Sequence, residues 1–162
     1  KRKAVINMNT LPPICFDMDG TLADLYGCPD WLDRLREYDP TPYIEAKPML
    51  PLKTLARHLN RLQNNGHKLV IISWLSKDST SEYDEAVRQA KRKWLARHLP
   101  SVVWDEIHLV KYGTPKHFIG ATPRSTCGGL LFDDSQPVRR LWGKYGEAYT
   151  EEDILSVLRD LE

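Results

Sequence analysis

The sequence predicts an α/β fold: a Rossmann-like, doubly wound parallel sheet of about five strands, with helices on both faces and a small cap insertion. Short apolar runs, typical of strands buried on both faces, alternate along the chain with segments of helical periodicity. The chain has 162 residues, of which 41% are apolar, and this suits one domain with a substantial core. We therefore expect a single domain over 1–162, with 22–51 as a small cap-like insertion within it.

Four apolar runs are expected to form the main strands. They lie at 13–16, 68–72, 107–110 and 130–132, and a very short further strand is expected at 147–149. The run at 68–72 is almost entirely apolar, as expected inside a parallel sheet. Because sites in such sheets form at the carboxyl ends of the strands, the residues that follow each run are the first candidates for function.

Helices are expected where apolar residues recur at spacings of three and four. Two long helices carry such a stripe over 52–62 and 83–94, and shorter ones begin near 114, 135 and 150. Thr114 is expected to cap its helix, and Thr150 opens a capping-box pattern. In the helix after Ser135, three apolar residues are expected to face inward, namely Val138, Leu141 and Trp142.

Residues 22–51 are less regular than the rest of the chain. They contain several prolines, and only one short helix is expected, over 29–38, because Pro40 prevents its continuation. The aromatic residues between the prolines allow two interpretations. They stack on a nucleobase of a substrate, or they form a small core of the insertion itself, which we favour. These residues are Tyr26, Trp31, Tyr38 and Tyr43.

The composition argues against several classes of protein. The net charge of +1 gives no global argument for binding nucleic acid or a membrane, and no apolar stretch approaches the roughly 20 residues that cross a bilayer. The three cysteines, Cys15, Cys28 and Cys127, are irregularly spaced, so we expect buried thiols in a reducing, cytoplasmic protein. The five histidines form no cluster with zinc-ligand spacing.

Two aspartates follow the first strand. Asp17 and Asp19 are separated by one residue, and residues at this spacing in a strand point to the same side. Two carboxylates held close together repel each other unless a cation or a proton lies between them. The pair therefore indicates a site for a cation, although an Asp-x-Asp-Gly sequence can also simply cap a turn.

Other strand ends supply partners for this pair. Asp133 and Asp134 follow the strand at 130–132, so up to four carboxylates gather at one edge of the sheet. Such a concentration of negative charge needs a hard divalent cation, and oxygen ligands with open positions suit Mg²⁺. We expect Asp17, Asp19, Asp133 and Asp134 to form the metal site.

A hydroxyl and an ammonium complete a site for a phosphoryl group. The residues expected to contact the phosphate are Gly20, Thr21, Ser73, Trp74 and Lys116. With phosphorus held there, a carboxylate next to the metal can attack it and form an aspartyl-phosphate. The aspartate two residues further on can protonate the leaving oxygen and later deprotonate the hydrolytic water.

These residues resemble the four motifs of the haloacid dehalogenase-like (HAD) phosphohydrolase superfamily. The matching stretches are Asp17-Met18-Asp19-Gly20-Thr21, the strand-terminal Ser73, a lysine before the fourth strand, and Asp133-Asp134. The resemblance implies that Asp17 is the nucleophile and that Asp19 is the general acid and base, with its backbone carbonyl on the metal. It also implies that Ser73 binds phosphate, that Lys116 stabilises charge, and that Asp133 and Asp134 hold Mg²⁺. The chain is also similar to deoxyribonucleotidase-like and phage-encoded members.

Two lysines compete for the role of the charge-stabilising residue. Lys111 lies at the end of the third strand, whereas Lys116 lies in the first turn of the next helix, where the helix dipole disfavours a cation. An unfavourable position suggests use, so we favour Lys116. The basic segment 88–98 is a patch for polyanions or a solvated helix face, and we favour the solvated face.

The expected function is that of a Mg²⁺-dependent phosphomonoesterase with a nucleotide, or another small phosphomonoester, as substrate. The insertion is small, and an open crevice would also admit the phosphorylated 5′ or 3′ end of a polynucleotide. A phosphotransferase that uses the same aspartyl-phosphate is a further alternative. A catalytically silent binding protein with this fold is disfavoured, because both aspartates of the first motif are present.

Overall fold

The structure is a computed structural model, and it describes residues 11–119 and 129–162. Five parallel strands form one sheet with the order β5-β4-β1-β6-β7, which confirms the predicted fold class. The strands are β1 (Ile14–Phe16), β4 (Leu69–Trp74), β5 (Glu106–Val110), β6 (Leu130–Phe132) and β7 (Glu147–Tyr149). Residues 1–10 lie outside the described residues, and so does Cys127.

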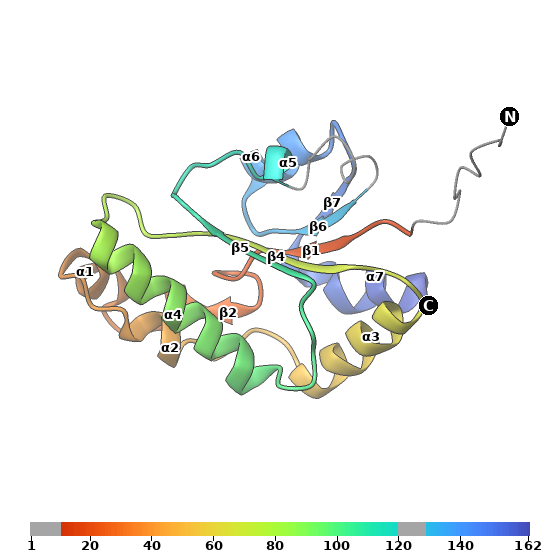
Figure 1. Cartoon of the computed structure of the whole chain (residues 1–162), viewed down its shortest axis with the longest axis horizontal. Helices are drawn as coiled ribbons and strands as arrows, with labels where there is room; N and C mark the ends of the chain where they lie inside the picture. The colour runs from red at the N-terminus through yellow and green to blue at the C-terminus, as the bar shows by residue number, and fades with distance from the viewer. Residues whose placement is uncertain (1–10, 120–128) are drawn as a thin grey trace, which may run out of the picture.

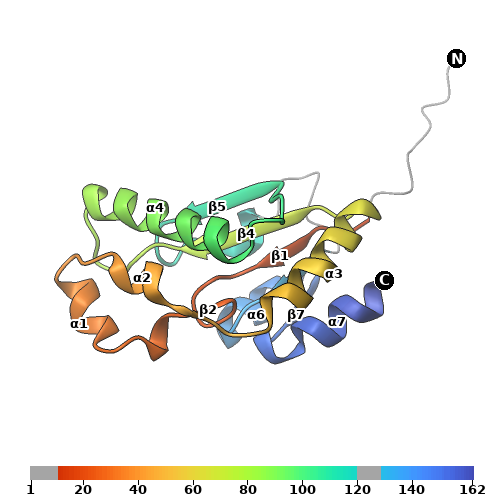
Figure 2. The same ribbon diagram turned by 90° about the horizontal axis from the view of Figure 1, so that it is seen from below.

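Helices cover both faces of the sheet, as Figures 1 and 2 show. One face carries α3 (Leu52–Asn64), α4 (Ser81–His98) and α7 (Ile154–Leu161), and the other carries the short helices α5 (Lys116–Ile119) and α6 (Gln136–Trp142). Within the described residues, no helix combines the length and apolar character that crossing a bilayer requires.

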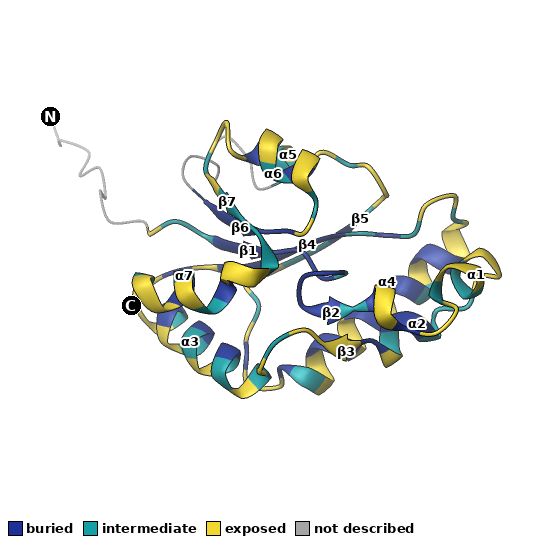
Figure 3. Ribbon diagram, turned by 180° about the vertical axis from the view of Figure 1, so that it is seen from behind, coloured by how far each residue is buried: buried dark blue, intermediate teal, exposed yellow. Residues whose placement is uncertain are grey.

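The alternation of side chains along β1 divides the core in two. Ile14 and Phe16 point to the face covered by α3, α4 and α7, while Cys15 points to the face covered by α6. Figure 3 shows the three central strands, β1, β4 and β6, as the buried centre of the molecule. Burial raises the pKa of the Cys15 thiol to about 12, so this cysteine behaves as a small apolar core residue.

The stripe predicted for 52–62 builds the larger core. Leu55, Leu59 and Leu62 of α3 have no exposed surface, and the chain turns after the helix at Gly66, whose φ of 109° suits glycine. In α4, the Thr80 side chain accepts a hydrogen bond from the backbone N–H of Tyr83 and caps the helix start. The two longest helices thus form where their apolar periodicity predicts them.

One inward-facing residue was predicted incorrectly in α6. Val138 and Trp142 are buried, but Leu141 is 41% exposed. A helix as short as α6 buries only a narrow stripe, and positions 138 and 142 occupy it because they lie one turn apart. Leu141 is displaced around the helix from this stripe and faces solvent.

The side-chain caps predicted for Thr114 and Thr150 do not form in the structure. The Thr114 hydroxyl donates to the carbonyl of Lys111 at 2.6 Å and does not cap α5. The Thr150 side chain makes no capping hydrogen bond, because a 3₁₀ turn, η2 (Glu151–Asp153), lies between it and α7. Short-range hydrogen bonds within the loops therefore replace the expected caps.

The insertion 22–51 is more regular than predicted. Two short strands, β2 (Ala23–Asp24) and β3 (Lys47–Pro48), pair antiparallel at its base, and η1 (Leu25–Gly27), α1 (Trp31–Arg36) and α2 (Thr41–Glu45) lie between them. The expectation of a single helix was wrong, because Pro42 lies in the first turn of α2, where its missing N–H has no cost.

Contacts with α4 fix the insertion in place. The Trp94 indole N–H donates to the carbonyl of Ala46 at 2.7 Å, and the Tyr83 hydroxyl donates to the carbonyl of Asp39 at 2.8 Å. Within the insertion, the Arg34 guanidinium pairs with both Asp39 and Glu45. Figure 2 shows α1 and α2 lying beside α4 at one end of the molecule.

Substitutions at two leucines test this assignment of the core. Leu59→Ala should destabilise the chain by about 2–5 kcal/mol, because it leaves a cavity under the sheet. Leu141→Ala should change stability by no more than about 0.5 kcal/mol, because its side chain is solvent-exposed. Urea unfolding of both variants measures the difference, and similar midpoints would contradict the assignment.

Candidate active site

The turn after β1 brings Asp17 against β6. The backbone N–H of Asp17 donates to the carbonyl of Phe132 at 2.9 Å, and the Met18 carbonyl accepts the N–H groups of the following turn. Gly20 adopts a φ of 77° in this turn, and a Cβ atom there would clash with the Asp134 carboxylate. Only glycine therefore lets the turn approach Asp134 so closely.

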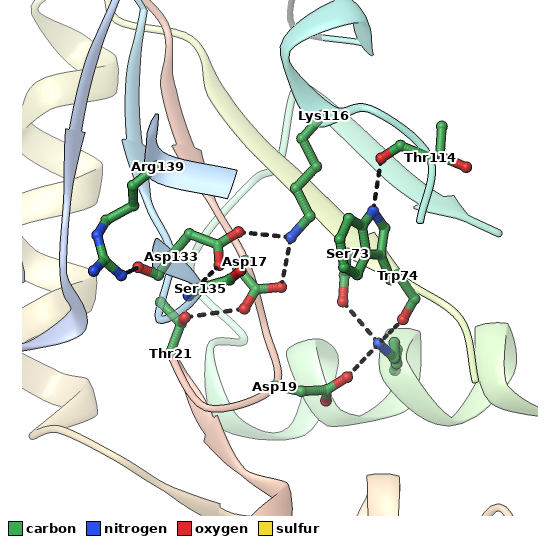
Figure 4. A network of polar contacts seen from close by, with 11 residues as sticks. Asp17, Asp19, Thr21, Ser73, Trp74, Thr114, Lys116, Asp133, Ser135 and Arg139 are labelled. Carbon is green, nitrogen blue, oxygen red and sulfur yellow. Dashed lines mark hydrogen bonds and ion pairs between the residues drawn. The ribbon is translucent and has the colours of Figure 1, made fainter. Parts of the chain in front are cut away.

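Lys116 lies between two of the predicted carboxylates. Its Nζ atom is 2.9 Å from Oδ1 of Asp17 and 2.7 Å from Oδ2 of Asp133, and all three side chains are buried (Figure 4). Burial alone would lower the pKa of Lys116, but these two carboxylates outweigh it and raise the pKa. The competing Lys111 is exposed.

The tryptophan at the end of β4 positions Lys116. The Trp74 indole N–H donates to the carbonyl of Thr114 at 2.8 Å and so holds the loop before α5 (Figure 4). Nζ of Lys116 lies 5.2 Å from the centre of the Trp74 ring, within the range of a cation–π interaction. Trp74, at the end of β4, thereby positions the Lys116 ammonium, which contacts the carboxylates that follow β1 and β6.

Three carboxylates form a cluster suited to a metal ion. Ligand oxygens of Asp17, Asp133 and Asp134 lie within 4.8 Å of one another. Burial and the neighbouring Asp17 raise the pKa of Asp133 to about 6 and that of Asp134 to about 8. Part of this rise is repulsion from the neighbouring Asp17 carboxylate, and a hard divalent cation would relieve it. The residues therefore fit Mg²⁺.

Asp19 faces a different partner. Its Oδ2 atom is 2.7 Å from Nζ of Lys91, a residue of α4 that is 1% exposed. The same Nζ atom lies 2.7 Å from Oγ of Ser73 and 2.7 Å from the carbonyl oxygen of Trp74. Burial raises the pKa of Asp19, and Lys91 acts in the opposite direction.

The solvated face predicted for segment 88–98 is wrong at Lys91, which is buried and belongs to the site. A signal was nevertheless present. Lys91 follows Val87 by four residues and precedes Trp94 by three, so it lies on the buried stripe of the helix. A lysine on such a stripe needs a buried acceptor, and the structure provides three.

Three of the expected phosphate contacts do not line the cavity at the site. The N–H groups of Gly20 and Thr21 donate to carbonyls of their own turn, and the Thr21 hydroxyl donates to Oδ2 of Asp17 at 3.0 Å. Ser73 has no exposed surface, and its hydroxyl accepts from Lys91. Gly20, Thr21 and Ser73 therefore stabilise the turn and the neighbouring side chains through these hydrogen bonds. Trp74 and Lys116 do line the cavity.

A cavity of about 660 Å³ opens from the carboxylates towards the insertion. Aromatic side chains form part of its walls, and they come from the insertion, from α4 and from the ends of β4 and β5. They include Tyr26, Trp31, Tyr38, Trp74, Tyr83 and Tyr112. Tyr26 and Tyr38 are each about half exposed, whereas Tyr43 is buried as a core residue of the insertion. Arg36 and Lys77 add positive charge to the lining.

Comparison with protein-family models finds no match for this chain, and comparison with curated protein sequences finds none either. Solved structures do match. The D,D-heptose 1,7-bisphosphate phosphatase from B. bronchiseptica, complexed with magnesium and phosphate, is 15% identical with a TM-score of 0.61, and the match covers 93% of this chain and 98% of that one. A protein from Mesorhizobium loti assigned as a HAD-like phosphatase is 14% identical with a TM-score of 0.59, over 93% and 87% of the two chains.

A chain of the Pnkp1/Rnl/Hen1 complex matches as well. It is 17% identical with a TM-score of 0.58, and the match covers 86% of this chain but only 44% of that one. The present chain thus spans less than half of that larger protein. At these identities the similarities establish a shared fold.

The carboxylate cluster makes the stability of the metal-free chain depend on pH. Because the folded pKa values of Asp133 and Asp134 are raised above 3.8, these two carboxyls bind more protons in the folded chain than in the unfolded chain between about pH 4 and pH 8. Stability in a chelator should therefore fall as pH rises through this window, and Mg²⁺ should restore it. Thermal unfolding measures both effects.

Asp134→Asn serves as the control for this prediction. The variant lacks the carboxyl with the higher of the two raised pKa values, so its loss of stability with rising pH should be smaller than in the wild type. The stabilisation by Mg²⁺ should be smaller as well, because one ligand is absent. Identical pH profiles for the two proteins would contradict the assignment of the cluster.

Proposed function

We propose that this chain, which has the fold of the haloacid dehalogenase-like (HAD) phosphatases, is a Mg²⁺-dependent phosphomonoester hydrolase that acts on a nucleotide through an aspartyl-phosphate. One observation carries the proposal. Lys116 contacts the buried Asp17 and Asp133 at the carboxyl edge of the sheet, where Asp134 completes the carboxylate cluster. A neighbour in fold that holds magnesium and phosphate supports it.

In the first step, a carboxylate oxygen of Asp17 bonds to the phosphorus of the substrate. The bond between phosphorus and the leaving oxygen breaks, and its electron pair goes to that oxygen, which takes a proton from Asp19. Lys116 already donates to Asp17 and lines the cavity, so it can donate to a phosphate oxygen as charge develops. The first product is an alcohol, such as a nucleoside.

In the second step, water hydrolyses the aspartyl-phosphate. Asp19, now ionised, takes a proton from the water as the water oxygen bonds to phosphorus. The bond between phosphorus and the Asp17 oxygen breaks and returns its electron pair to the carboxylate, so both aspartates regain their starting states. Asp19 lines the cavity, where water and substrate can reach it.

The side chains of Asp17, Asp133 and Asp134, together with the backbone carbonyl of Asp19, would hold Mg²⁺. When bound, the ion supplies positive charge that offsets the repulsion between the carboxylates and the phosphoryl oxygens. Ser135 and Arg139 support this arrangement: the Ser135 N–H donates to Oδ1 of Asp133, and the Arg139 guanidinium donates to the Asp133 carbonyl, each at 2.9 Å.

The aromatic cavity supports a nucleotide as the substrate. Three pairs of aromatic rings, each with centroids within 5.5 Å, lie around it: Tyr26 with Trp31, Tyr38 with Tyr83, and Trp74 with Tyr112. A nucleobase gains stacking energy on such surfaces. We infer that the insertion 22–51 acts as a small cap that supplies much of this wall.

The phosphorylated 5′ or 3′ end of a polynucleotide is the second candidate. Two cations, Arg36 and Lys77, line the cavity and could meet the phosphate of an adjoining nucleotide. Transfer of the phosphoryl group to an acceptor alcohol, in place of water, would use the same intermediate. Product analysis with competing alcohols distinguishes phosphoryl transfer from hydrolysis.

Buried thiols fit a cytoplasmic location. Cys15 and Cys28 are free and buried in the described part of the chain, with Cys28 8% exposed. Free thiols persist in compartments that keep cysteines reduced. We therefore infer a reducing environment for the working protein.

Replacing the proposed nucleophile tests the chemistry. The wild type with Mg²⁺ should release phosphate from p-nitrophenyl phosphate and from nucleoside monophosphates, and a chelator should abolish the release. Asp17→Asn should reduce turnover to background, because the amide cannot form the intermediate, while circular dichroism shows a folded chain. A wild type that hydrolyses no phosphomonoester would overturn the proposal.

Replacing a wall residue of the cavity tests the substrate. Trp31→Ala should raise KM for a deoxynucleoside monophosphate by roughly 5- to 150-fold, which corresponds to the loss of one stacking contact of about 1–3 kcal/mol. KM for p-nitrophenyl phosphate should change less, because its single small ring has other aromatic partners. Tyr145→Ala, an exposed tyrosine outside the cavity, is the matched control. Parallel assays with end-phosphorylated oligonucleotides decide between the two substrate classes.

A further inference from the structure

Lys91 is the most deeply buried lysine of the described chain, and it lies outside the predicted motifs. Its side chain is 1% exposed. Each of its three possible donations has an acceptor at 2.7 Å: Oδ2 of Asp19, Oγ of Ser73 and the carbonyl oxygen of Trp74. A buried ammonium is costly to desolvate, and this set of acceptors compensates for that cost.

Two of these acceptors anchor the ammonium to the sheet. Ser73 and Trp74 are the last residues of β4, and the Tyr43 ring of the insertion lies 5.0 Å from Nζ of Lys91. Lys91 therefore has a fixed position at the end of this strand. The third bond reaches Asp19, which follows the neighbouring strand β1, and Figure 4 shows the Ser73 and Asp19 side chains pointing towards the same place.

We propose that Lys91 is a positioning residue that ties the Asp19 carboxylate to the end of β4 and so fixes its orientation for proton transfer. The inference rests on the proposed function. Lys91 acts through Asp19, because Lys91 does not line the cavity whereas Asp19 does. Oδ2 of Asp19 is held by Lys91 and its side chain remains 16% exposed, so the rest of the carboxylate can meet the leaving oxygen.

The two buried lysines divide the aspartate pair between them. Lys116 from α5 contacts Asp17, and Lys91 from α4 contacts Asp19, so the adjacent carboxylates are drawn apart. Without Lys91, Asp19 would lose the contact that holds it to β4 and could rotate away from the leaving oxygen. A displacement of about 1 Å at a reacting group can cost about 10²-fold in rate.

The size of this loss in rate depends on how basic the leaving group is. A nucleoside alkoxide is strongly basic and needs the proton of Asp19 as its bond to phosphorus breaks. p-Nitrophenolate is weakly basic and can leave without one. A variant with a misplaced Asp19 should therefore lose kcat/KM for the nucleotide far more than for p-nitrophenyl phosphate. A general disturbance of the fold would lower both values together.

The test compares Lys91→Met with Lys93→Met, an exposed lysine of the same helix. The ratio of kcat/KM for a nucleoside monophosphate to that for p-nitrophenyl phosphate should fall by about 10²-fold in Lys91→Met and stay unchanged in Lys93→Met. Lys91→Gln, which keeps an N–H donor for Asp19, should recover part of the loss. In an Asp19→Asn background, Lys91→Met should not lower the ratio further.

An unchanged ratio in Lys91→Met, or an equal fall for both substrates, would overturn the inference while leaving the proposed function intact. A wild type without phosphatase activity would overturn the proposed function, and stability then decides whether Lys91 holds Asp19. Lys91→Met leaves a carboxylate without its partner, so adding Asp19→Asn should not lower the urea midpoint further. Fully additive shifts of the midpoint would rule out the contact.

Discussion

Repulsion between carboxylates is the constraint around which the site is built. The parallel order of the strands brings Asp17, Asp133 and Asp134 to one edge of the sheet, where their ligand oxygens lie within 4.8 Å of one another. Two lysines from opposite faces of the sheet contact the aspartates: Lys116 of α5 contacts Asp17 and Asp133, and Lys91 of α4 contacts Asp19. The helices on both faces thus supply the cations as well as covering the core, and the proposed Mg²⁺ would complete the balance.

The sequence was sufficient to predict the sheet, because its strands are short apolar runs and its site residues follow them directly. The carboxyl ends of parallel strands must meet, so Asp17, Lys116 and Asp133 could be grouped before any contact was known. Lys91 could not be grouped in this way. It lies within α4 and follows no strand, and a charge on a helix is usually solvated, so only its place on the buried stripe of the helix pointed to it.

The insertion was hard to predict for a different reason. Its strands contain two residues each, and such pairs form only because the rest of the domain holds their ends together. Its prolines suggested irregular chain, yet Pro42 begins a helix. Leu141 shows the same limit in a helix of seven residues, where tertiary packing decides which apolar side chain is buried.

The central place of β1 has a consequence for how the protein is made. β1 pairs with β4 on one side and with β6 on the other, and Ile14 lies opposite Leu130 in this pairing. A ribosome that has released only the first half of the chain has produced Asp17 and Asp19 but not Lys116, Asp133 or Asp134. The site therefore assembles late, after a long loop has closed, and a nascent or truncated chain would hold the aspartate pair without its metal partners.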